Sequence, residues 1–193
     1  MTRRWTLRLG AGLVLTASLL SGCSAKQEAN QTLPTSSAAE TTPELPPLGP
    51  EDFPVPAEAR EKTPEGAVEF VRYYVGLAKF LAQNSTDAQP LLDLSQDCDI
   101  CGQIAASLQE DFAAGYSYRD YDYSFKETGP GLIHGETAEM GFVYVQGPIT
   151  VLDPTGNVVR DRSSGRTAEL QSGAVLLWRN DLQSWAITTL TVG

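Results

Sequence analysis

The spacing of apolar residues changes its period along the chain. Between Pro64 and Leu81 they recur every three or four positions, which predicts an amphipathic helix. Thr63 can cap this helix, and Pro64 suits its first turn. Shorter helices are predicted over 89–95 and over 102–114, the second ending at Gly115. The buried stripe of the first helix comprises Ala67, Phe70, Val71, Tyr74, Leu77, Ala78 and Leu81.

After residue 115 the period becomes two, which is typical of strands. Tyr118 and Tyr121 are three positions apart, so we expect a bulge near 119–120. The segment 153–157 is predicted to be the turn of a hairpin over 147–162, and 165–173 an insertion-like stretch. Helices followed by strands indicate an α+β domain over 57–193, with the helices packed on an antiparallel sheet.

The first 22 residues are typical of a signal peptide. Three arginines lie within the first eight residues, and the apolar run 9–20 is too short to span a bilayer. Residues 20–23, Leu-Ser-Gly-Cys, resemble a bacterial lipobox. We therefore expect Cys23 to carry palmitate or similar acyl chains and to anchor the protein on the extracytoplasmic face of the cell membrane. The alternative to a lipid anchor is an ordinary secreted protein. Because Arg3 and Arg4 are adjacent, the twin-arginine route is a second possible route of export.

Residues 23–56 form a predicted stalk. The stretch from Ser24 to Pro56 holds seven of the twelve prolines and is poor in apolar residues. It cannot bury enough surface to offset the entropy of ordering, so we expect it to be disordered. Such a stalk would hold the domain off the membrane, either as a spacer of required length or as a passive linker.

The charge balance narrows the range of partners. The 14 Lys and Arg are outnumbered by 24 Asp and Glu, which gives a formal net charge of −10. This acidity disfavours nucleic-acid binding and direct docking on anionic lipid headgroups. The lipid on Cys23 is then the expected membrane contact.

Cys98 and Cys101 are the cysteines that remain once Cys23 is acylated. An even pair in an exported protein predicts a disulfide bond, which would order the start of the following helix. A redox pair is the alternative, because cysteines near a helix N-terminus have a lowered thiol pKa.

The other chemistry-bearing residues predict neither a metal nor a cofactor. His134 is the single histidine, which leaves too few ligands for a zinc site and no partner for nucleophilic catalysis. The aspartates at 97, 99, 120 and 122 lack the spacing of a calcium loop. We therefore assign no catalytic residue.

Tyrosines and aspartates are interleaved between residues 116 and 123. This composition indicates aromatic packing against the sheet with polar tips at the rim. The alternative is a binding lip at the mouth of the fold. Possible pocket or rim residues are Tyr74, Tyr121, Asp122 and Tyr123.

Three motifs resemble an actinobacterial lipoprotein family of unknown function. They are Thr-Pro-Glu-Gly-Ala-Val-Glu-Phe-Val-Arg-Tyr-Tyr at 63–74, Cys-Asp-Ile-Cys at 98–101 and Trp-Ala-Ile at 185–187. Members of that family resemble the nuclear transport factor 2-like cone. The resemblance covers 57–193 and implies helices packed across a curved antiparallel sheet, with no assigned reaction.

Together these features predict a non-catalytic module that binds a protein, a cell-wall component or a small molecule. The alternative is an enzyme of the ketosteroid-isomerase or hydratase kind, because cones of this shape often enclose a pocket. Tyr74 and Asp122 would be its candidate residues.

Overall fold

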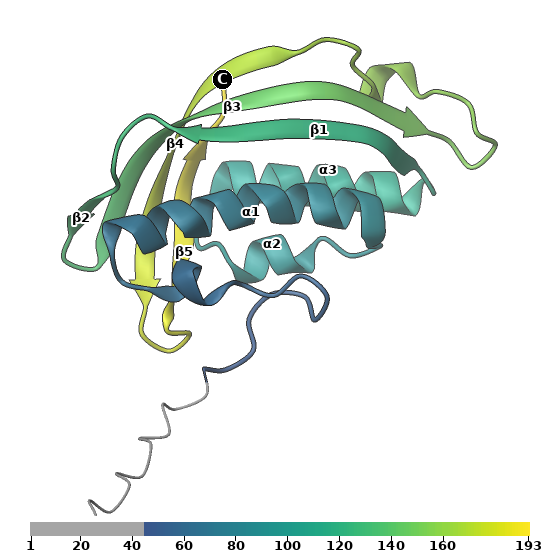
Figure 1. Ribbon diagram of the computed structural model, residues 1–193. Coiled ribbons are helices and arrows are strands. Elements are labelled where there is room, and N and C mark those ends of the chain that lie inside the picture. The colour runs from purple at the N-terminus through teal and green to yellow at the C-terminus, as the bar shows by residue number, and fades with distance from the viewer. Residues whose placement is uncertain (1–44) are drawn as a thin grey trace, which may run out of the picture. The chain divides into compact units, whose positions relative to one another are not determined.

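The computed structural model describes residues 45–193, so the predicted signal peptide, Cys23 and the first part of the predicted stalk lie outside the described range. The α-helices precede the strands along the chain and lie on the concave side of a curved sheet (Figure 1). The predicted α+β architecture, with helices on an antiparallel sheet, is confirmed. No helix within residues 45–193 is long and apolar enough to cross a membrane. The elements are η1 Ala57–Arg60, α1 Pro64–Asn84, α2 Gln89–Asp93, α3 Asp99–Ala113, β1 Ser117–Glu127, β2 Leu132–His134, β3 Thr137–Leu152, η2 Arg160–Arg162, β4 Ala168–Arg179 and β5 Ser184–Thr191.

Antiparallel pairing joins the long strands in the order β1-β3-β4-β5. β3 pairs with β1 over 142–152 and with β2 over 137–139. The outer edge of β5 is covered by the linker between α2 and α3: Gln96 N donates to Ile187 O at 2.8 Å, and Ile187 N donates to Leu94 O at 3.0 Å. The chain thus protects this sheet edge with its own backbone.

α1 begins and packs as the sequence predicts. Thr63 Oγ1 accepts a hydrogen bond from the Gly66 N–H at 3.0 Å, which satisfies one of the free donors of the first turn. Phe70 and Leu77 on the apolar stripe are both 0% exposed. α1 lies against β1, whereas α3 lies against β5.

α3 begins three residues before the predicted start at 102, because the cysteine segment belongs to its first turn. Cys98 is the N-cap residue, and its Sγ accepts a hydrogen bond from the Cys101 N–H at 3.2 Å. The two cysteines are joined by a disulfide bond. After the helix, Gly115 has a φ of +69°, a left-handed conformation that glycine adopts without strain.

Among the strands, one prediction is wrong, that of an inserted stretch, and two are confirmed, the bulge and the turn. Residues 168–173, expected to lie in an insertion, form the first half of β4 and pair with β3. Long pairing of this kind leaves no room for an inserted loop. The register does shift between Tyr118 and Tyr121, as predicted. The turn at 153–157 is also present, with Asp153 Oδ1 accepting from the Asn157 N–H at 2.9 Å.

The packed region begins before the boundary expected at residue 57. Phe53 stacks between Tyr73 and Phe80 of α1, at ring-centroid distances of 5.3 and 4.7 Å. Val55 is buried, and its N–H donates to the Leu48 carbonyl at 2.9 Å. Together with the Tyr73 hydroxyl, which donates to the Phe53 carbonyl at 2.8 Å, these contacts hold the proline-rich segment on the domain.

Candidate functional site

A mainly apolar hollow lies between the helices and the concave face of the sheet. It has a volume of about 260 Å³ and draws its walls from α1, α3, β1, β3 and β5. A hollow of this kind, predominantly apolar and with a few polar groups, is the usual form of a small-molecule site. Its lining residues are Tyr74, Val75, Ala78, Ile100, Ile104, Tyr121, Phe142, Tyr144, Gln146, Leu190 and Val192.

Side-chain size explains why this part of the concave face stays open. α1 presents Val75 and Ala78 here, and α3 presents Ile100 and Ile104 across from them. These short or branched side chains do not bridge the space that separates the helices from the sheet. Ile100 lies between the two bonded cysteines, so the disulfide fixes the turn that carries it.

The polar groups of the cavity are tyrosine hydroxyls and one amide. The Tyr74 hydroxyl donates to the Leu91 carbonyl at 3.0 Å, and burial raises the pKa of this side chain to about 12. Burial likewise raises the pKa of Tyr121 and Tyr144. These hydroxyls are therefore neutral at physiological pH and act through hydrogen bonds. The lining residues include no carboxylate, imidazole or amine.

A second hollow of about 400 Å³ adjoins the cavity along α3 and is more polar. At its end the guanidinium of Arg162, from η2, reaches α3: Nη1 donates to Ser107 Oγ at 2.7 Å and Nη2 to Glu110 Oε2 at 3.0 Å. Its Nε lies 3.2 Å from Oδ1 of Asp111, a carboxylate that is only 1% exposed. The Tyr118 hydroxyl donates to Oδ2 of the same carboxylate, and burial followed by this contact raises the pKa of Tyr118.

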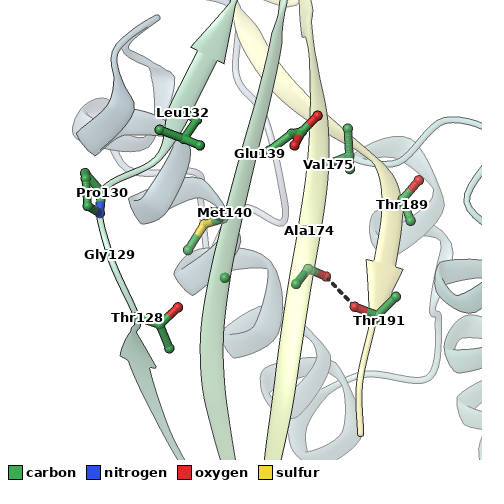
Figure 2. A pocket seen from close by; sticks show the side chains of 12 residues that line it. Thr128, Gly129, Pro130, Leu132, Glu139, Met140, Ala174, Val175, Thr189 and Thr191 are labelled. Carbon is green, nitrogen blue, oxygen red and sulfur yellow. Dashed lines mark hydrogen bonds between the residues drawn. The ribbon is translucent and has the colours of Figure 1, made fainter.

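A third hollow, of about 410 Å³, lies on the opposite face of the sheet (Figure 2). Gly141 of β3 is paired with Gly173 of β4, and the absence of two neighbouring side chains leaves a shallow floor. Thr128, Glu139 and Thr191 stand around it, as Figure 2 shows. Figure 2 also shows the Thr191 hydroxyl bonded within the sheet, where it donates to the Gly173 carbonyl at 3.3 Å.

The structure brings some of the expected pocket residues together and separates others. Tyr74 and Tyr121 line the cavity. Tyr123 lies outside the lining set and stacks on Tyr144 at 5.8 Å, with Lys79 over its ring at 5.7 Å. The side chain of Asp122 is 83% exposed and also lies outside the cavity lining. Tyr74 and Asp122 therefore do not form the acid-base pair expected for an enzyme.

Residues that the sequence analysis did not assign to a site complete the lining. Ile100, Ile104 and Gln146 are the chief examples. Ile104 lies in the helix predicted over 102–114, and its apolar character indicated burial without distinguishing a filled core from a cavity wall. Gln146 is polar at an inward-facing strand position, which is a signal that could have found it.

His134 ends β2 and is exposed. Across residues 45–193 no group of three or more His, Cys, Asp or Glu side chains is placed to hold a metal ion.

The order of elements, the curved unclosed sheet and the cavity beneath two helices together define a known architecture. The fold is the nuclear transport factor 2-like cone. The intermembrane space region of the chloroplast protein ARC6 is similar to this chain, with a TM-score of 0.54 and 12% sequence identity over 68% of this chain and 97% of that one. At this identity the likeness concerns the fold alone.

Two further solved structures show weaker similarity. A nuclear transport factor 2-like superfamily protein from Salmonella enterica serovar Typhimurium has a TM-score of 0.40 and 12% identity over 66% of this chain and 90% of its own. A putative calcium/calmodulin dependent protein kinase II association domain from Xanthomonas campestris has a TM-score of 0.35 and 14% identity over 66% and 84%. No protein-family model matches the chain, and no curated protein is significantly similar to it.

Proposed function

We propose that this protein is a non-catalytic binding module that holds an apolar group of a small molecule in the cone cavity. The single observation that carries the proposal is the open cavity of about 260 Å³ between α1, α3 and the sheet. An apolar group entering this space would leave water and gain contacts with Val75, Ala78 and Ile104. The hydroxyls of Tyr121 and Tyr144 and the amide of Gln146 would supply hydrogen bonds that orient it.

The chemistry of the lining favours binding over catalysis. General acid-base catalysis uses a group with a pKa near the working pH. The ionisable groups of the cavity are tyrosines, and the pKa of Tyr74 is about 12. The enzyme alternative needed a carboxylate beside Tyr74, and Asp122 does not line the cavity. An isomerase or hydratase role is therefore less well supported than ligand binding.

The proposal places this module outside the cytoplasmic membrane, anchored by lipid on Cys23. The order of basic, apolar and small residues before that cysteine supports the anchor. In a bacterial host, Cys23→Ser should abolish incorporation of labelled palmitate and release the protein from the membrane fraction. Unchanged labelling and fractionation of this variant would refute the anchor without affecting the cavity proposal.

The cavity proposal is tested with the neutral apolar fluorophore N-phenyl-1-naphthylamine. Its fluorescence should rise with the wild-type protein. Ala78→Phe places a ring in the cavity from α1 and should weaken binding at least tenfold. Ala113→Phe, an exposed change at the end of α3, is the matched control and should bind like wild type.

The stability of both variants is measured by urea denaturation, so that loss of binding can be separated from loss of folding. A folded Ala78→Phe variant that binds the fluorophore as tightly as the control would refute the cavity as the binding site. Absence of any fluorescence change with the wild-type protein would also count against it.

A further inference from the structure

The cone cavity and the polar hollow beside it meet along α3. Ile100, Ile104 and Tyr121 border both of them. The first has a volume of about 260 Å³ and is mainly apolar, whereas the second, of about 400 Å³, ends at Asp161 and Arg162. A ligand that fills both spaces must therefore be apolar along one part and polar at the other.

The positive charge in the second hollow is already compensated. Arg162 donates to Glu110 at 3.0 Å and lies 3.2 Å from Asp111. A further hydrogen bond, from Arg162 Nη1 to Ser107 Oγ at 2.7 Å, fixes the guanidinium in place. This arginine is consequently a poor partner for an anionic ligand, since two carboxylates already share its charge.

One carboxylate at the same end takes no part in these ion pairs. Asp161 lines the hollow and is exposed to solvent. Within residues 45–193 it takes part in no ion pair. Asp111 is only 1% exposed and does not line the hollow, and its carboxylate is already engaged by Arg162 and by the Tyr118 hydroxyl. Glu110 and Asp111 offset the charge of Arg162, so Asp161 is the lining residue of this hollow whose charge has no ion-pair partner within residues 45–193.

We propose that the ligand is an amphiphile whose aliphatic part enters the cone cavity and whose cationic, donor-rich head lies at Asp161. This rests on the proposed function of the cavity and adds the class of its ligand. A primary ammonium group suits this end of the second hollow, because it brings a positive charge and three hydrogen-bond donors to the carboxylate oxygens of Asp161.

The test compares three octyl compounds by isothermal titration calorimetry near pH 7 and at low ionic strength. Octylammonium, octan-1-ol and octanoate share one chain and differ in the charge of the head. Octylammonium should bind most tightly and octanoate most weakly. The advantage of octylammonium over octan-1-ol should shrink as salt is added, because exposed charges are screened.

Asp161→Asn should weaken octylammonium binding about three- to fivefold, the effect of one partly exposed charge pair, and leave octan-1-ol binding unchanged. Glu169→Gln removes an exposed carboxylate on β4 that does not line either hollow, and is the matched control. It should leave all three affinities as they are in the wild type.

The outcomes separate this inference from the proposed function. If octan-1-ol binds and Ala78→Phe abolishes that binding, but octylammonium shows no advantage, the cavity proposal stands and the cationic head is refuted. Tighter binding of octanoate would refute it as well. If none of the three compounds binds, both proposals fail.

Discussion

Two parts of the interface between helices and sheet differ in how they are filled. Near the start of α1, Trp185 and Trp178 meet edge to face at 5.1 Å, and Trp185 is 0% exposed. Its indole N–H donates to the Glu61 carbonyl at 2.8 Å, just before the helix. Toward α3, α1 presents Val75 and Ala78, and a cavity of about 260 Å³ remains.

The difference shows how one cone supports both a stable core and a binding space. Aromatic rings at the filled end bury large apolar areas and satisfy their polar atoms, which stabilises the fold. At the open end, the hollow is bordered but not closed by Tyr74, Ile104 and Tyr121. We expect substitutions at the first region to change stability and those at the second to change binding.

The largest effect should come from the filled end. Trp185→Ala removes a fully buried ring and leaves a cavity, which should lower the free energy of unfolding by about 3–5 kcal/mol. Ile104→Ala, on the cavity wall, should cost only about 1 kcal/mol because this side chain is half-buried and already faces open space. Urea denaturation of both variants measures the contrast. Equal losses would contradict the distinction between the two regions.

A charged cluster bounds the open end, and breaking it should have the next largest effect. Arg162→Met leaves the Asp111 carboxylate, which is 1% exposed, without its cation. The expected loss is about 3 kcal/mol. Adding Asp111→Asn should recover at least half of it, because the amide needs no counter-charge. Chemical denaturation of the single and double variants gives the coupling energy, and simple additivity would show that the pair is not coupled.

The disulfide bond at the start of α3 should stabilise the wall of the cavity more than the core. Changing Cys98 and Cys101 to serine should lower the free energy of unfolding by about 2 kcal/mol, as expected for so short a loop. Binding of N-phenyl-1-naphthylamine should persist in the folded variant. Thiol-disulfide oxidoreductase activity of the purified wild-type protein would instead support the redox alternative.

Tyr74 lies where the filled and open regions meet, and its ionisation gives the smallest predicted effect. Burial raises its pKa to about 12, so folding favours the neutral hydroxyl. The stabilisation that the buried neutral hydroxyl gives to the folded state is fully present below the unfolded pKa, near 10. It is lost as the pH rises toward the folded pKa of about 12. By pH 11 the wild type should lose about 1 kcal/mol more stability, relative to pH 8, than Tyr74→Phe. Denaturation curves at both pH values test this, and parallel losses in the two proteins would contradict it.

Local order was predictable because neighbouring residues encode it. The three- and four-residue spacing around Phe70 and Leu77 predicted α1, and Thr63 and Pro64 predicted its start. The turn at 153–157 followed from its own side chains, since Asp153 bonds the backbone of residues two and four positions later. The even pair of cysteines left after Cys23 likewise predicted the disulfide bond.

The site depended on contacts that spacing does not record. Arg162 and Ser107 are 55 residues apart in the chain and meet at 2.7 Å. Asp122 and Tyr123 were candidates because of their composition, yet neither side chain lines the cavity. The packing of Phe53 on α1 was not predicted, because the proline-rich composition around it indicated disorder. Composition does not show where a single aromatic ring packs.

By itself, the sequence determined the helices, the change to strands and the pairing of the cysteines, and it predicts the lipid anchor at Cys23. These features depend on residues close together in the chain, through backbone geometry, capping and periodic burial. The tertiary structure decided which inward-facing residues fill the core and which border an empty space. That choice depends on the curvature of the sheet and on where α3 lies relative to α1, so Ile104 and Tyr121 became a cavity wall only once the chain had folded.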